Sequence, residues 1–139
     1  MAARVYSAAV IGIHAQSVEV EVDVLSQGLH NFTLVGLPDQ AIKESRERVS
    51  AALKNSSFRP PHQQGRITVN LAPADLPKNS PIYDIPIALG ILLTTGQLTF
   101  LPEGKLFVGE LALDGAVRKI SGALAIAVFA KEAGYTEIY

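Results

Sequence analysis

Lys78 and Ser80 are the residues of this sequence whose types and spacing could do covalent chemistry. They lie in a polar loop that ends where an apolar helix is expected to begin, at about Asp84. Backbone N–H groups at a helix N-terminus can stabilise an oxyanion, and a serine nucleophile with a lysine base is an established arrangement. The alternative is turn chemistry, because serine in a loop rich in Pro, Asn and Ser usually supplies turn or capping hydrogen bonds.

Other familiar catalytic and cofactor-binding patterns are absent from the sequence. There is no G-x-x-x-x-G-K-[ST] run and no G-x-G-x-x-G run, so this stretch cannot hold a nucleotide in the P-loop manner. The absence of cysteine excludes disulfides, thiolate metal sites and a cysteine nucleophile, and it suits a reducing cytoplasm. His14, His30 and His62 lie far apart in expected loops or strand ends, so we expect no metal site.

Period-two patterns predict a sheet that positions the loop containing Lys78 and Ser80, called the Lys78 loop below. The clearest is Ser17–Leu25, where valines alternate with Glu and Asp, which predicts one buried face and one acidic face in contact with water. Asp114-Gly115 predicts a hairpin turn. The remaining expected strands are Val5–Ile13, Asn31–Val35, Arg66–Leu71, Lys105–Leu113 and one that begins at Thr136.

Three helices are expected, over Asp39–Asn55, Asp84–Thr95 and Ile120–Ala133. The second is apolar on nearly every side, so it must be buried or covered, and Gly90 in its interior indicates close packing against a neighbour. This order of strands and helices predicts an α+β fold with a mixed sheet and helices packed mainly on one face.

The first helix carries the charged run Lys43–Arg48. The pairs Lys43–Glu47 and Glu44–Arg48 are spaced four residues apart and can form on the outside of the helix, at a few tenths of a kcal/mol each. One interpretation of the run is a solvated helix face. The other is a face that binds a partner or a phosphate group.

Length and composition indicate one globular domain. With 139 residues, 48% hydrophobic and 18% charged, the chain can bury a core and is not a disordered tail. The net charge of -1 gives no global basic footprint of a nucleic-acid binder, although a local patch remains open. No apolar run approaches the about 18 residues of a membrane span, so we expect a cytoplasmic protein. Because Thr136–Tyr139 looks like a strand that has just begun, we expect residues 1–139 to be one domain of a longer chain.

Three segments resemble one protein family: Val35–Ser56 (VGLPDQAIKESRERVSAALKNS), Arg66–Leu92 (RITVNLAPADLPKNSPIYDIPIALGIL) and Val108–Tyr135 (VGELALDGAVRKISGALAIAVFAKEAGY). Together they resemble the N-terminal domain of the ComM/YifB-type AAA+ ATPases, historically called magnesium-chelatase-like. The resemblance implies a Lon-protease-like fold, shared with a ribosomal protein domain. It also implies that an AAA+ ATPase module follows in the same chain, that ATP and Mg²⁺ bind in that module and not in this domain, and that the full-length protein forms a homo-oligomeric ring.

The distant similarity to Lon proteases can be compared position by position. The nucleophile motif Pro-Lys-Asp-Gly-Pro-Ser-Ala-Gly matches residues 77–84, which places Ile82 at the nucleophile. The Gly-Gly-Leu-Lys run that carries the base matches residues 121–124, which places Leu124 at the base. Ser80 lies two residues before the nucleophile position, and this displaces its oxygen by several Å. The resemblance therefore implies a domain with no catalytic residues and no cofactor or metal site.

The resemblance implies a non-catalytic accessory domain of a branch-migration motor in natural transformation, one that supports assembly or the engagement of DNA or another partner. Two alternatives stay open: a residual peptidase that uses Ser80 and Lys78, and a purely structural oligomerisation domain. No aromatic ladder for stacking single strands is visible, and no membrane partner is expected. The candidate contacts to a partner or DNA are Lys43, Arg46, Arg48, Arg66 and Lys78, with Arg59 also available.

Overall fold

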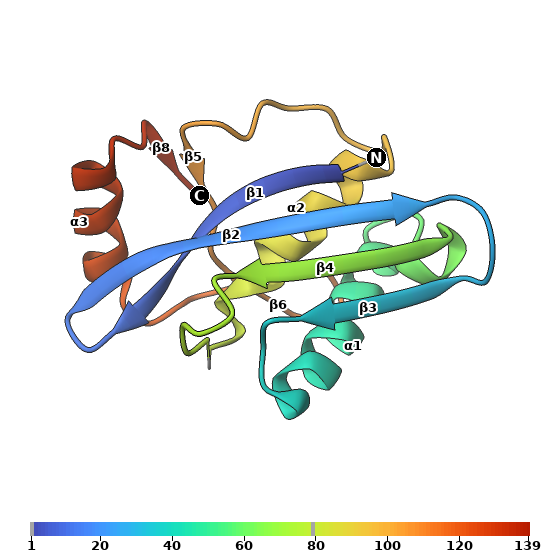
Figure 1. The fold of residues 1–139 in the computed structure, drawn as a ribbon, viewed down its shortest axis with the longest axis horizontal. Helices are drawn as coiled ribbons and strands as arrows, with labels where there is room; N and C mark the ends of the chain where they lie inside the picture. Colours follow the sequence, from blue (N-terminus) through green and yellow to red (C-terminus); the bar gives the residue numbers. More distant parts are fainter. Residues whose placement is uncertain (1, 79) are drawn as a thin grey trace.

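A six-stranded mixed sheet is the frame of the chain (Figure 1). The structure, a computed structural model, describes residues 2–78 and 80–139. The strands are β1 (Ala2–Ile11), β2 (His14–Leu25), β3 (Asn31–Val35), β4 (Arg66–Ala72), β5 (Lys105–Leu106), β6 (Glu110–Leu111), β7 (Val117–Arg118) and β8 (Glu137–Ile138). The helices are α1 (Asp39–Asn55), α2 (Asp84–Thr94) and α3 (Ala123–Ala133), with 3-10 helices η1 (Pro61–Gln63) and η2 (Pro81–Tyr83). Within the described residues, none of the helices has the length and apolar character that a membrane crossing needs.

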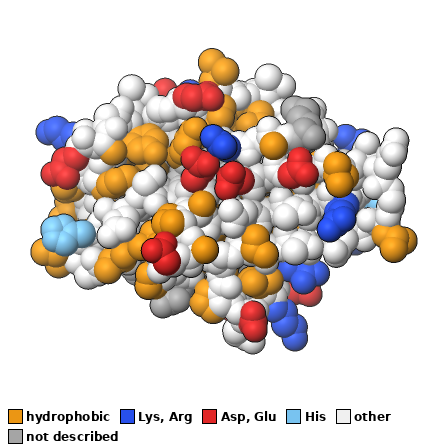
Figure 2. Space-filling view, viewed as in Figure 1, with side chains coloured by type: hydrophobic (Ala, Val, Ile, Leu, Met, Phe, Trp, Pro, Cys, Tyr) orange, Lys and Arg blue, Asp and Glu red, His pale blue; other side chains and the backbone are white. Residues whose placement is uncertain are grey.

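The sheet has the strand order β3-β4-β2-β1-β5-β8, and β6 and β7 form a separate ribbon. β1 and β4 both pair antiparallel with β2, whereas the other pairs of the sheet are parallel. Val18, Val20 and Val22 are fully buried on one face of β2, and the acidic side chains between them lie on the opposite face. There Arg4 pairs with Glu19 at 3.2 Å, and Figure 2 shows acidic and basic side chains side by side near the middle of this face. The expected buried and acidic faces are confirmed.

Helices α1 and α2 pack on the buried face of the sheet. α2 crosses β1 and β2, and a Cβ atom added at Gly90 would lie 2.5 Å from Cγ2 of Val22. The close packing expected at Gly90 is therefore confirmed. α1 packs beside α2 and against β3, where Phe32 and Leu34 are buried.

Helix α3 covers the opposite face, near the tip of the β1–β2 hairpin. A Cβ atom at Gly122 would lie 2.8 Å from Cγ2 of Val10, and the ring of Tyr135 lies 6.4 Å from that of Tyr6. Val10 and Tyr6 alternate along β1 with Val5, which faces α2, so the two groups are on opposite faces of the sheet. The α+β class and mixed sheet are confirmed, and two of the three helices share one face.

The strand expected over Lys105–Leu113 is interrupted. Gly109 N donates to Ile82 O at 2.8 Å, and Gly109 O accepts from Ile85 N at 3.1 Å. These hydrogen bonds lead the chain away from the sheet and towards the start of α2, so β5 and β6 belong to different sheets. The hairpin expected at Asp114-Gly115 is confirmed by the antiparallel pair β6–β7.

Candidate functional site

The Lys78 loop does not present its amine to solvent. Lys78 is 2% exposed, and its Nζ donates to the carbonyl oxygens of Pro73 at 2.5 Å and Leu76 at 2.8 Å. Burial lowers the pKa of the Lys78 amine, and the carboxylate of Asp75 acts in the opposite direction. Contrary to our expectation, Lys78 is not on a surface that a partner or DNA can reach, because its ammonium group holds two carbonyl groups of its own loop.

Ser80, the other half of the expected pair, lies apart from that amine. Its side chain is exposed, and within the described residues no hydrogen bond joins its hydroxyl to Lys78. A serine nucleophile needs its base within about 2.6–3.2 Å. The loop therefore does not present a Ser–Lys pair in this structure.

The two positions that the resemblance assigns to a protease dyad have different surroundings. Ile82 is 3% exposed and lines a cavity of about 620 Å³ together with Ser121 and Gly122. Leu124 is 79% exposed and lines another cavity, of about 510 Å³, beside Ile13. Both side chains are hydrocarbons, so neither cavity gains a nucleophile or a base from these positions.

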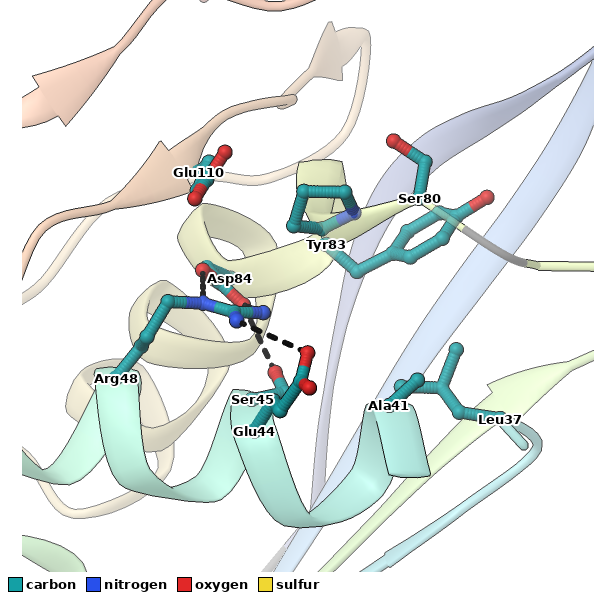
Figure 3. A pocket seen from close by; sticks show the side chains of 10 residues that line it. Leu37, Ala41, Glu44, Ser45, Arg48, Ser80, Tyr83, Asp84 and Glu110 are labelled. Atoms are coloured by element: carbon teal, nitrogen blue, oxygen red, sulfur yellow. Dashed lines mark hydrogen bonds and ion pairs between the residues drawn. The ribbon is translucent and has the colours of Figure 1, made fainter. Parts of the chain in front are cut away.

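Buried polar groups cluster around Asp84 at the N-terminus of α2 (Figure 3). The Asp84 side chain is 1% exposed. Its carboxylate accepts hydrogen bonds from Arg48 Nε at 2.6 Å, Arg48 Nη2 at 3.1 Å, Ser45 Oγ at 2.8 Å and Leu111 N at 3.1 Å. We call these four residues the Asp84 cluster. Because the donors come from α1 and β6, one carboxylate ties α1, α2 and the β6–β7 ribbon together, beside a cavity of about 190 Å³.

Arg48 belongs to the Asp84 cluster and not to an open surface. The hydrogen bonds and the charge of Asp84 raise the pKa of the Arg48 guanidinium, although burial acts the other way. The expected pair with Glu44 is present at 3.8 Å, but the contact with Asp84 is much shorter. Arg48 was expected as a contact residue, and the structure instead uses its charge to neutralise a buried carboxylate.

Lys43 and Arg46, by contrast, meet at the surface. They face a hollow of about 570 Å³ between α1, the start of β3 and η1. Figure 2 shows Lys and Arg side chains at the lower right, the region in which Figure 1 places β3 and α1. Arg46 Cζ lies 6.0 Å from the ring centroid of Phe32. Arg66 begins the neighbouring strand and stands opposite Asn31 in the β3–β4 register. We call this the α1–β3 hollow; its lining is His30, Asn31, Phe32, Lys43, Arg46, Glu47, Ser50 and His62.

Two of the histidines also meet in the α1–β3 hollow. His30 Nδ1 lies 2.8 Å from the carbonyl oxygen of His62, across a sequence separation of 32. The expectation that the histidines lie apart is wrong for this pair, because β3–β4 pairing places the segments before both strands side by side, as Asn31 N bonded to Gly65 O at 3.0 Å shows. The spacing of the histidines carried no signal of this contact.

The historical name of the resembling family, magnesium-chelatase-like, points to a magnesium site. Among residues 2–78 and 80–139, no group of three or more His, Asp or Glu side chains could hold a metal ion. The carboxylate of Asp84 already accepts four hydrogen bonds from protein donors. The described residues therefore do not fit a Mg²⁺ site.

Comparison with known proteins establishes the family. The family model described as subunit ChlI of Mg-chelatase matches residues 18–139. The chain belongs to this magnesium-chelatase-like family. Within it, the chain is 46% identical over 132 residues to YifB of Escherichia coli K12 and 49% identical over 124 residues to the competence protein ComM of Haemophilus influenzae Rd. These alignments cover 94% and 88% of this chain.

The match to the magnesium-chelatase-like family covers a domain-sized segment of longer relatives. The chain spans 25% of the length of YifB and 24% of the length of ComM. A third relative, protein Mb2921c of Mycobacterium bovis, is 41% identical over 136 residues, and the alignment spans 97% of this chain and 26% of that protein. The Asp84 cluster and the α1–β3 hollow both lie inside the residues that the family model matches.

Proposed function

We propose that this chain is a non-catalytic accessory domain, with a Lon-protease-like fold, of a ComM/YifB-like AAA+ ATPase. The domain supports assembly of the motor or its engagement with DNA or another partner. ATP and Mg²⁺ bind in an ATPase module outside residues 1–139, and the complete protein works as a cytoplasmic homo-oligomeric ring. The name of the H. influenzae relative, a competence protein, points to DNA remodelling in natural transformation as the process served.

The observation that carries this proposal is the state of the two protease positions. Ile82 is buried and Leu124 projects from α3 with 79% of its side chain exposed, and neither has a group that exchanges protons. The nearby Lys78 amine is bonded to two backbone carbonyls. These observations support the proposal that the domain does not hydrolyse peptides, because neither position supplies a nucleophile or a base and the Lys78 amine is engaged by its own loop.

A domain replacement in the H. influenzae competence protein tests the accessory role. The segment of ComM that matches this chain is replaced by residues 1–139 in one strain and deleted in another, and transformation frequency is measured in both. We expect the replacement to retain transformation and the deletion to reduce it at least tenfold. Wild-type transformation in the deletion strain would show that the motor does not need this domain.

A peptidase assay tests the loss of chemistry separately. The chain is incubated with fluorescent casein beside its Ser80→Ala variant. We expect no cleavage by either protein above a buffer control. Cleavage that disappears in the Ser80→Ala variant would establish a residual peptidase and overturn the non-catalytic assignment.

An assembly role has its own support in an exposed apolar surface beside α3. The exposed fractions of Ile13, Leu124 and Val128 are 84%, 79% and 48%. Apolar side chains grouped in this way often mark a protein–protein contact. If this surface supports assembly, Leu124→Glu in the domain-replaced ComM will reduce ring formation in light scattering with ATP, while Lys54→Gln, at the exposed end of α1, will not.

A further inference from the structure

The α1–β3 hollow differs from the other cavities in the kind of groups that line it. It contains the side chains of Lys43 and Arg46, the imidazoles of His30 and His62, and the hydroxyl of Ser50. The cavity beside Ile82 is lined mainly by apolar and backbone groups, and that beside Leu124 by apolar side chains with His14 and Glu132. In the cavity beside Asp84 the cation, Arg48, is bonded to the carboxylate of Asp84. Cations grouped with neutral hydrogen-bonding groups are the usual composition of a phosphate-binding surface.

The two cations of the hollow are available to a ligand. Within residues 2–78 and 80–139, neither the Lys43 amine nor the Arg46 guanidinium takes part in a hydrogen bond or an ion pair. Arg46 lies over the face of the Phe32 ring at 6.0 Å, a contact that orients the guanidinium without using its N–H donors. Arg48, two residues along the same helix, has its donors committed to Asp84.

The opposite wall of the hollow is fixed by a long-range contact. Because a carbonyl oxygen can only accept, His30 Nδ1 donates the hydrogen bond of 2.8 Å to His62 O. This bond joins the segment before β3 to η1 and sets the orientation of the His30 ring. The hollow is therefore bounded on one side by α1. On the other side it is bounded by η1 and the segment before β3, which this hydrogen bond joins.

The hollow has a volume of about 570 Å³ and two exposed cations, which suits an extended polyanion better than a single small anion. Arg66 stands opposite Asn31 at the start of β4, but the period-two alternation of β4 places its side chain on the face of the sheet that carries Glu21, away from Lys43 and Arg46. Glu19 and Glu21 on that open face pair with Arg4 at 3.2 and 3.9 Å, whereas Lys43 and Arg46 have no ion-pair partner among the described residues. Phe32 is only 7% exposed, so its ring is not available for base stacking.

We propose that the α1–β3 hollow binds phosphate groups of a nucleic-acid backbone through Lys43 and Arg46. This inference rests on the proposed accessory role and names the partner surface of the domain. Because the contacts are to phosphates, binding depends strongly on salt and little on base sequence. Glu47, the acidic side chain of the lining, opposes binding.

Fluorescence anisotropy with a labelled single-stranded oligonucleotide of about 20 nucleotides, at about 50 mM salt, tests the proposal. We expect Lys43→Gln and Arg46→Gln each to weaken binding several-fold and to reduce the slope of log K against log salt by about 1. The double variant loses at least tenfold in affinity, whereas Glu47→Gln binds more tightly than the wild type. The control is Lys131→Gln, which removes the same charge from the exposed surface of α3 and leaves affinity within twofold.

Three further results would overturn the proposal. One is no oligonucleotide binding by the wild-type chain at about 100 μM, far above ordinary non-specific affinities. A second is a double variant that binds as well as Lys131→Gln. The third is binding of inorganic phosphate or ATP at the hollow, seen as NMR shifts of the His30, Lys43 and Arg46 amides, with no shifts from the oligonucleotide. That pattern would assign a free-anion site.

The binding test and the test of the accessory role fail independently. A domain-replaced ComM that restores transformation while the isolated chain binds no oligonucleotide keeps the accessory role and removes this site. Conversely, a deletion strain with normal transformation removes the accessory role whatever the chain binds in solution. Urea midpoints of the Lys43→Gln and Arg46→Gln variants, expected to equal that of the wild type, show that lost binding does not come from unfolding.

Discussion

Helix α1 carries two basic regions that the structure uses in opposite ways. In the Asp84 cluster, Arg48 faces the interior and both of its hydrogen-bonded contacts go to a buried carboxylate. In the α1–β3 hollow, Lys43 and Arg46 face solvent and have no ion-pair partner among the described residues. Arg46 and Arg48 are two positions apart, which is about 200° around a helix, so they point to nearly opposite sides.

The comparison separates charges that build the fold from charges that remain available for binding. A buried ion pair contributes through geometry and satisfied hydrogen bonds, and removing one partner leaves the other uncompensated. A surface cation contributes little to the free energy of unfolding, and it remains able to form an ion pair with a bound anion. Substitutions in the Asp84 cluster should therefore change the free energy of unfolding, and those in the hollow should change binding.

The largest effect is expected for Asp84→Asn. The amide has the same shape but removes the nearest counter-charge of the partly buried Arg48 guanidinium, so the free energy of unfolding should fall by about 3–5 kcal/mol. Urea denaturation followed by circular dichroism measures the change. As a control, Asp75→Asn in the exposed part of the preceding loop should stay within about 0.5 kcal/mol of the wild type. Equal midpoints for the two variants would contradict a structural role for the cluster.

A second pair of variants compares the two arginines directly. Arg48→Met should lower the free energy of unfolding by about 2–4 kcal/mol, because Asp84 loses its counter-ion while keeping the bonds from Ser45 and Leu111. Arg46→Met should lower it by less than about 1 kcal/mol, the size of the lost cation–π contact. In the anisotropy assay the order reverses, and only the Arg46 variant loses affinity. If both variants lose the same stability, the division of α1 into two regions is wrong.

Ser45→Ala should have a smaller effect in the same cluster. It removes one of the hydrogen bonds to Asp84, while the guanidinium and the Leu111 amide still hold the carboxylate. We expect a loss of about 1–2 kcal/mol in urea denaturation, in the range for hydrogen bonds to charged groups. Ser50→Ala, which removes a hydroxyl from the hollow side of the same helix, should change stability by less than about 0.5 kcal/mol.

The smallest effect is expected in the pH dependence of Lys78. Burial lowers the pKa of the Lys78 amine in the folded chain below its ordinary value of 10.5. Just below pH 10.5 the unfolded chain therefore binds more protons than the folded chain. As a result, the free energy of unfolding of the wild type rises with pH in that range. The Lys78→Met variant lacks this rise. The free energy of unfolding of the wild type should therefore increase relative to that of the variant from pH 7 to pH 10. Urea midpoints at several pH values measure it.

The matched control for that pH series is Lys54→Met, at the exposed end of α1. Its curve should run parallel to the wild type across the same range. A Lys78→Met curve that also runs parallel would mean that burial of the amine does not shift its proton binding.

Most of the framework could be predicted from local patterns. The bounds of β3 and α1 agree with the expected Asn31–Val35 and Asp39–Asn55, and the alternation along β2 gave the correct buried face. These features depend on neighbours within a few positions, where side-chain periodicity decides exposure. The interruption at Gly109 could not be predicted in this way, because it depends on hydrogen bonds to Ile82 and Ile85, more than twenty positions earlier.

The candidate site was less predictable than the fold. Of the five expected contact residues, Lys43 and Arg46 line the hollow and Arg66 lies beside it, whereas Arg48 and Lys78 are engaged internally. The sequence shows which residues are cations, but it does not show whether a carboxylate lies beside each of them in the folded chain. The partner of Arg48 lies 36 positions away, and no local pattern reports a contact at that range.

The residue pattern alone fixes the helices, most of the strands, the apolar face of the sheet and the aliphatic identity of Ile82 and Leu124. It also determined the family, through motifs that run along most of the chain. Only the tertiary structure decided which charges are free, which are paired, and that His30 and His62 meet. The physical reason is that secondary structure follows from local periodicity, whereas the state of a charge depends on burial and on partners that the fold brings from distant segments.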